Sequence, residues 1–180
     1  MTEKSFTTDL DALKQRADSK RDAFEVMMYQ LQDDDDLSDE KIDTLADKIA
    51  TPIINAIDCT TCANCCRSLD VQLGDDDLAR LANGIDVPLD KIKTHVAVQD
   101  NDDPDIIGTF AEKPCAFLDG KLCSVYAHRP TSCRDYPQFT PDFRWMLSWM
   151  INGAHLCPII YHVLVAMVEE LDDLQRNNNL

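Results

Sequence analysis

Hydrophobic residues recur every three to four positions near the start of the chain, which is the spacing of one face of an α-helix. The stretch runs from Leu10 to Leu31, and Thr8 or Asp9 is placed to cap its first turn. Four consecutive aspartates, residues 33–36, follow it. The spaced oxygens and central glycine of a calcium loop are missing from this run, so it predicts a solvated linker.

Two further amphipathic stretches predict helices on either side of the middle of the chain. Ser38 is an N-cap residue type for the first of them, and we expect Pro52 to end or kink that helix. Pro158 suits the first position of the second helix, whose apolar stripe reaches Leu174.

Shorter elements are expected between these helices. Aspartates at residues 75–77 favour the first turn of a short helix that ends at Gly84, and Pro88 begins another helix through Val96. The position of the three aspartates in a first turn indicates a helix cap rather than a binding site.

Residues 115–126 have a different pattern, in which Asp119-Gly120 stands between two apolar, strand-like pieces. An Asp-Gly pair in this setting is a strong signal for a β-hairpin. The three prolines within residues 129–141 predict a loop.

The composition is that of a globular protein: 180 residues, 44% hydrophobic and 28% charged. Seventeen basic against 33 acidic residues give a formal net charge of −16, which repels nucleic-acid phosphates and anionic membranes. We therefore expect neither as a partner. No apolar run reaches about 18 residues and no export signal is visible, so a cytoplasmic location is expected.

Eight cysteines are confined to the middle of the chain. In a reducing compartment many cysteines indicate a metal site rather than disulfides. Their first group has the pattern C-x2-C-x2-C-C, and successive C-x2-C steps let thiolates converge on one ion. A redox dithiol would need no third and fourth cysteine. The candidate metal ligands are Cys59, Cys62, Cys65, Cys66, Cys115, Cys123, Cys133 and Cys157.

The adjacent pair Cys65-Cys66 bears on the kind of site. Neighbouring side chains usually diverge, so the pair favours two metal ions or a polynuclear cluster over one ion, with a vicinal disulfide as the alternative. Eight thiolates fill two tetrathiolate sites; equally, four hold one 4Fe–4S cluster and the others bind a second metal or are structural. His128 and His155, the histidines nearest to cysteines in the sequence, are expected outside the ligand set.

Three arginines lie within a few residues of cysteines: Arg67, Arg129 and Arg134. Their guanidinium groups are candidates to donate hydrogen bonds to ligand sulfurs and to offset the charge of a thiolate site. The alternative is that they pair with nearby acids such as Asp70 and Asp135.

The cysteine pattern resembles a known family. The chain carries C-x2-C-x2-C-C, C-x-F-L, C-x-V-Y-x-x-R-P-x-x-C-R-x-Y-P and a last cysteine, in that order, at residues 59–66, 115–118, 123–137 and 157. This order resembles the YkgJ-type cysteine-cluster proteins over residues 55–160. The resemblance implies a bacterial, cytoplasmic domain that chelates zinc or iron, with no settled reaction.

The same module is similar to one in flagellin lysine N-methylases, which implies an iron–sulfur cluster. Methylation is not carried over, because the chain has 5 glycines and no glycine-rich strand-to-helix signature for S-adenosylmethionine. The C-x3-C-x2-C pattern of radical S-adenosylmethionine enzymes is also absent from the sequence.

We expect a mainly α fold in which helices pack around an irregular cysteine-rich metal-binding centre with one small β-hairpin. The expected organisation is an N-terminal helical segment (1–54), a cysteine-cluster domain (55–160) and a C-terminal helix packed on it (161–180). The expected function is to hold an iron–sulfur cluster or zinc through cysteine thiolates. The alternatives are a redox or methyl-transfer enzyme using that centre, and a structural zinc in a protein-interaction module, whose partner the sequence does not identify.

Overall fold

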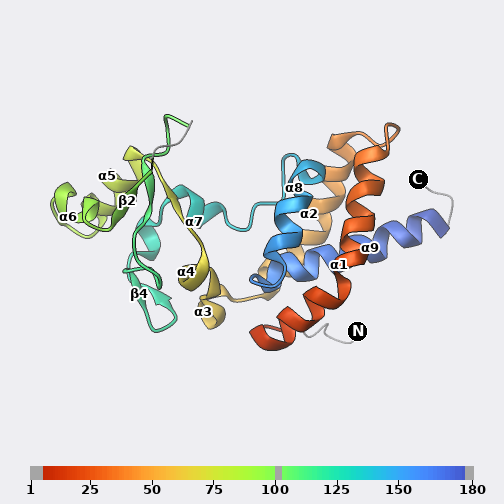
Figure 1. The fold of residues 1–180 in the computed structure, drawn as a ribbon, viewed down its shortest axis with the longest axis horizontal. Coiled ribbons are helices and arrows are strands. Elements are labelled where there is room, and N and C mark those ends of the chain that lie inside the picture. Colours follow the sequence, from red (N-terminus) through yellow and green to blue (C-terminus); the bar gives the residue numbers. More distant parts are fainter. Residues whose placement is uncertain (1–5, 100–102, 177–180) are drawn as a thin grey trace. The chain divides into compact units, whose positions relative to one another are not determined.

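The computed structural model describes residues 6–99 and 103–176 and forms two compact units (Figure 1). The helical unit contains the described residues up to 58 and from 137 onward. The cysteine unit contains the described residues of 59–136 and seven of the eight cysteines. The expected mainly α fold is confirmed. The expected division near residues 54 and 160 stays a prediction.

The helical unit is built from four long helices that pack against one another (Figure 1). They are α1 (Leu10–Asp33), α2 (Asp39–Ala56), α8 (Phe143–Gly153) and α9 (Pro158–Arg176). Their apolar faces form a buried core that includes Leu13, Phe24, Ile42, Ala46, Phe143, Leu147, Met150, Ile160, Leu164 and Met167. Within the described ranges, no helix is long and apolar enough to cross a membrane.

The predicted starts of the long helices are confirmed. The Asp9 carboxylate accepts a hydrogen bond from the Ala12 amide at 2.7 Å at the start of α1, and Ser38 caps α2. Helix α9 begins at Pro158. Pro52 was expected to end or kink α2; the helix does not end there but continues to Ala56. Proline removes only one backbone donor, and the last turn is held by the buried Ile53.

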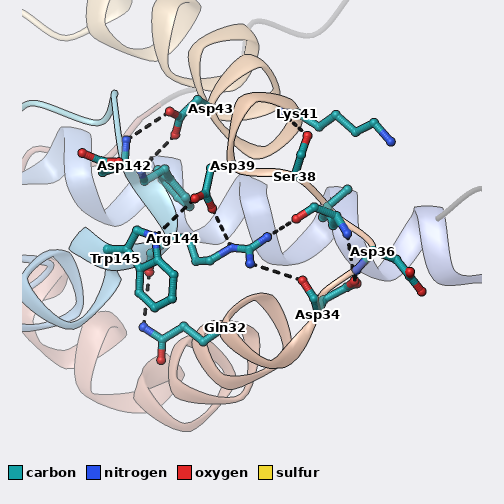
Figure 2. A network of polar contacts seen from close by, with 12 residues as sticks. Gln32, Asp34, Asp36, Ser38, Asp39, Lys41, Asp43, Asp142, Arg144 and Trp145 are labelled. Carbon is teal, nitrogen blue, oxygen red and sulfur yellow. Dashed lines mark hydrogen bonds and ion pairs between the residues drawn. The ribbon is translucent and has the colours of Figure 1, made fainter.

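Arg144 of α8 is almost fully buried and ties the connection between α1 and α2 to the rest of the helical unit (Figure 2). Its guanidinium donates to the backbone carbonyls of Asp34 (3.2 Å) and Leu37, and it lies 3.1 Å from the Asp39 carboxylate. Asp34 Oδ1 in turn accepts from the Leu37 amide at 3.0 Å. The acidic run 33–36 is therefore an ordered, hydrogen-bonded connection and not only the solvated linker that we expected.

The same region fixes the start of α8, because both oxygens of the Asp43 carboxylate accept backbone hydrogen bonds there (Figure 2). Their donors are the amides of Asp142 at 3.0 Å and Phe143 at 2.9 Å. Helix α8 was not expected, although Phe143, Leu147 and Met150 follow helical spacing.

The cysteine unit consists of short elements. In chain order they are α3 (Cys59–Cys62), α4 (Asn64–Ser68), β1 (Gln72–Leu73), α5 (Asp75–Gly84), α6 (Leu89–Lys93), β2 (Val96–Val98), β3 (Gly108–Phe110), β4 (Leu118–Asp119), β5 (Leu122–Cys123), the 3-10 helix η1 (Tyr126–His128) and α7 (Thr131–Asp135). Helix α5 ends at Gly84, as predicted.

Two small antiparallel sheets lie in this unit. Strands β4 and β5 form the predicted hairpin, with Asp119 paired to Leu122 and Gly120 at a φ of 60° in the turn. The other sheet has the strand order β1-β3-β2 and was not expected. Two expectations are corrected: Val96 begins strand β2 instead of ending a helix, and residues 129–141 contain helix α7.

A separate hydrophobic core supports the cysteine unit. It contains Leu73, Leu78, Leu81, Ala82, Ile92, Phe110, Phe117 and Val125. Cys115 and Cys123 pack against its edge, half-buried. Two of the cysteines therefore have positions fixed by apolar packing next to them.

Candidate metal centre

The first cysteine group occupies two very short helices, α3 and α4, joined at Ala63. Ala63 has a φ of 53°, and its amide donates to the Cys59 carbonyl at 3.0 Å, which closes α3. The left-handed residue starts a new helical turn, so that Cys65 and Cys66 lie on α4.

The sulfur atoms of Cys65 and Cys66 lie 3.9 Å apart. We expected neighbouring side chains to diverge, which favoured two metal ions or a polynuclear cluster over one ion, but here the two sulfurs lie close together. In a tetrahedral site with zinc–sulfur bonds of about 2.3 Å, neighbouring sulfurs lie about 3.8 Å apart. The adjacency alone therefore does not favour two metal ions over one.

A backbone hydrogen bond joins the two cysteine groups, because the Cys115 amide donates to the Cys66 carbonyl at 2.8 Å. Cys115 directly precedes the hairpin, and Cys123 lies at the end of β5, paired with Leu118. Cys133 lies on α7, where its amide donates to the Pro130 carbonyl at 3.0 Å.

Four thiols of this unit interact electrostatically, and Cys66 is common to the interactions. A hydrogen bond with Cys65, helped by Arg67 and Arg129, lowers the pKa of Cys66 to about 6 although its burial opposes this. Burial first, and then the charges of Cys66, Cys115 and Cys123, raise the pKa of Cys133 to about 12, although Arg129 opposes them.

Burial and the charges of neighbouring thiols also act on Cys115 and Cys123. Burial first, and then the charges of Cys66 and Cys123, raise the pKa of Cys115. Burial and then the charge of Cys66 raise the pKa of Cys123, while Arg129 opposes them. Close thiols that disfavour one another's charge are the donor set that a cation would stabilise.

Two of the three arginines act near the sulfurs in different ways. Arg67 donates to the backbone carbonyls of Cys62 (3.0 Å) and Gly120 (2.7 Å), so it links the first cysteine group to the hairpin turn. Arg129 lies over the ring of Tyr126, 3.6 Å from its centroid, and its charge lowers the thiol pKa of Cys66. Sequence reasoning missed Tyr126, although its spacing of three from Arg129 was visible.

The alternative in which these arginines pair with local acids is not what the structure shows. Asp70 pairs with Lys113 at 2.6 Å, and Arg134 donates to the Thr131 hydroxyl at 3.0 Å. Within residues 6–99 and 103–176, neither Asp70 nor Asp135 forms an ion pair with an arginine.

Cys157 and the histidines each have their own surroundings. Cys157 belongs to the helical unit, where it is buried directly before α9. His128 lies on η1, against Gly84 of α5, and His155 is on the surface of the helical unit. His95 pairs with Glu112.

The thiols suit the chemistry of zinc and iron, which both accept all-thiolate ligation. In the described part of the chain, no three Cys, His, Asp or Glu side chains already surround a common point as metal ligands. The fit of the donor set therefore rests on the identity of the residues and on the mutual effects of the thiols on their pKa values.

Comparison with known families gives one match. The family model CxxCxxCC, described as "Putative zinc- or iron-chelating domain", matches residues 58–151. This segment is more than half of the chain and includes every cysteine except Cys157. The chain belongs to the CxxCxxCC family. Membership supports metal binding by zinc- or iron-type chelation, and no curated protein and no solved structure matches the chain.

Proposed function

We propose that this CxxCxxCC domain holds zinc or an iron–sulfur cluster through cysteine thiolates, with Cys66, Cys115, Cys123 and Cys133 as its central ligands. One observation carries the proposal: the 2.8 Å hydrogen bond from the Cys115 amide to the Cys66 carbonyl joins the two cysteine groups, and burial, followed by the charge of Cys66, raises the pKa of each of the last three thiols. A bound cation reverses the sign of that interaction, because it attracts all four thiolates.

Cys59, Cys62 and Cys65 are the other proposed ligands of the cysteine unit, and the role of Cys157, which belongs to the helical unit, is tested separately below. The 3.9 Å separation of the Cys65 and Cys66 sulfurs supports a shared ion or cluster at that point. Arg129 and Arg67 reduce the net negative charge of such a centre and hold its backbone. A thiolate-bound zinc supplies structural cross-linking, and an iron–sulfur cluster supplies one-electron chemistry.

The deciding experiment measures metal and acid-labile sulfide in the full chain after purification without oxygen, together with the visible spectrum. Iron and sulfide in similar amounts identify a cluster, and zinc without sulfide identifies a tetrathiolate zinc site. Neither metal above a trace, after reconstitution with each, would overturn the proposal.

Matched variants locate the ligands. Cys66→Ser and Cys133→Ser are expected to lose at least half of the bound metal and to melt at a lower temperature, because metal binding and folding are coupled. Ser68→Ala, an exposed change on the same helix as Cys66, is expected to keep both.

Cys157→Ser tests the eighth ligand separately. If Cys157 is a ligand, the Cys157→Ser variant contains less bound metal than the parent protein. Full metal content combined with a lower melting temperature would instead assign Cys157 to the packing of the helical unit, in which it is 7% exposed.

A further inference from the structure

A second candidate site is a cleft of about 710 Å³ on the cysteine unit, lined by none of the cysteines. Asp76, Arg80, Asn83, His128 and Arg134 are among its lining residues. The volume is within the range of small-molecule sites, about 300–1,000 Å³. Two arginines line it in a chain whose formal net charge is −16.

One wall of the cleft is the polar face of helix α5. Asp76, Arg80 and Asn83 are spaced by four and three residues and so share one face of the helix. The opposite face, with Leu78 and Leu81, is buried in the core. The apolar face of α5 therefore packs in the core, while the polar side chains of the same helix line the cleft.

The other wall carries His128, whose position is set by close packing. A Cβ atom added at Gly84 would lie 2.1 Å from the nearest atom of the His128 ring. The ring therefore rests directly on the backbone of α5, where only glycine leaves room for it.

Two guanidinium groups converge in this cleft. Arg80 Nη2 lies 3.3 Å and Arg134 Nη2 lies 3.0 Å from the same atom, the hydroxyl oxygen of Thr131. Arg80 also pairs with the buried Asp77 carboxylate. Two guanidinium groups thus share one hydroxyl, and the Asp77 carboxylate pairs with Arg80 alone.

The donors of these arginines are not used up by the protein. In the described part of the chain, Arg134 has no carboxylate within ion-pair distance, and the buried Arg80 Nε has no hydrogen-bond partner. Asp76 is the one carboxylate among the lining residues. Asp76 and Asp77 balance the two arginines in charge, so what the lining carries in excess is hydrogen-bond donors.

We propose that this cleft binds the phosphate group of a small organic phosphate. A phosphate monoester carries a charge of about −1.5 to −2 and three strong acceptor oxygens. Arg134, which has no carboxylate partner in the described part of the chain, supplies the charge and the forked donors for such a group, and Arg80, Asn83 and His128 supply further polar contacts. A carboxylate group has one charge and two oxygens, and so satisfies fewer of these donors. The rest of the cleft volume accommodates the organic part.

The test follows backbone amide chemical shifts of the full chain by NMR during titration with glycerol phosphate, inorganic phosphate or acetate. We expect saturable shifts at residues 76–84 and 128–134, with glycerol phosphate binding more tightly than inorganic phosphate and acetate binding at least tenfold more weakly.

Three variants each make the net charge of the protein more negative by one. Asn83→Asp and Arg134→Gln, in the cleft, are expected to weaken glycerol phosphate binding at least tenfold, and Lys93→Gln, on exposed α6, less than twofold.

The absence of saturable shifts would overturn the proposal, and so would an equal effect of Lys93→Gln, which would indicate general electrostatics. Acetate binding as tight as glycerol phosphate would refute the preference for phosphate, and equal binding of inorganic phosphate would refute an organic ligand. The inference does not depend on the metal proposal. The Asn83→Asp variant is expected to keep its full metal content. Metal content and phosphate binding therefore test the two proposals separately.

Discussion

The buried carboxylate of Asp77 accepts two hydrogen bonds from Thr131, from the amide at 2.9 Å and from the hydroxyl at 3.0 Å. The same carboxylate accepts from the Gly74 amide at 3.2 Å and pairs with Arg80. One side chain thus caps α5 and fixes the start of α7, the helix that carries Cys133. An acidic run that was expected only to cap a helix also positions a candidate ligand.

Replacing Asp77 by Asn is expected to lower the free energy of unfolding of the cysteine unit by about 2–4 kcal/mol. The amide keeps the shape but loses the charge that Arg80 needs, and its NH2 group faces donors. Chemical denaturation followed by circular dichroism measures the change. Asp75→Asn, an exposed change in the same turn, is the control and should alter stability by less than about 0.5 kcal/mol. Equal stability of the two variants would refute the role of Asp77.

Replacing Arg144 by Met is expected to destabilise the helical unit by about 2–3 kcal/mol. The variant keeps most of the buried aliphatic volume but leaves the carbonyls of Asp34 and Leu37 without their donor. Thermal unfolding is the measurement, and Arg21→Met, which breaks an exposed pair with Glu25, is the control. A loss no larger than that of the control would contradict a structural role for the buried guanidinium.

The stability of the helical unit is expected to fall as the pH decreases from 7 to 5.5, in part because of His162. Burial lowers the pKa of His162, and Arg16 acts in the same direction, although the Thr7 carbonyl opposes them. Below the ordinary pKa of about 6.5 the unfolded chain therefore binds a proton that the folded chain resists. Stability lost in this window is regained as the pH rises.

The variant His162→Gln isolates this contribution, because glutamine retains a donor for Thr7 but does not titrate. The difference in unfolding free energy between pH 7 and 5.5, measured in urea, should be smaller in the variant than in the parent. Identical pH dependence in both proteins would show that His162 does not contribute.

The elements predicted from the sequence are those with strong local signals. The long helices have several turns of apolar periodicity, and the hairpin has Asp119-Gly120, whose glycine adopts a positive φ. The sheet β1-β3-β2 was missed because its strands have two or three residues, too few for alternation to be visible. Its pairing joins Leu73 to Gly108, a contact between distant segments that local patterns do not encode.

The candidate site shows the same division between local and distant information. The spacing of cysteines predicted which residues could act as ligands, and the resemblance to a family added zinc or iron. The sequence could not predict that the Cys65 and Cys66 sulfurs lie close together, or that Arg67 donates a hydrogen bond to the carbonyl of Gly120. The pairing of Arg80 and Arg134 at one hydroxyl also depends on folding, since these residues lie far apart in the chain.

The hydrogen bond from the Cys115 amide to the Cys66 carbonyl closes a long loop between the two cysteine groups. Bringing together the ends of a flexible loop of about 50 residues costs on the order of 3 kcal/mol in entropy. Folding of the cysteine unit meets that cost, with the apolar core and the Arg67 contacts holding the loop ends. In the proposed site, an ion bound by the first cysteine group therefore has the later thiols as intramolecular partners at a high effective concentration.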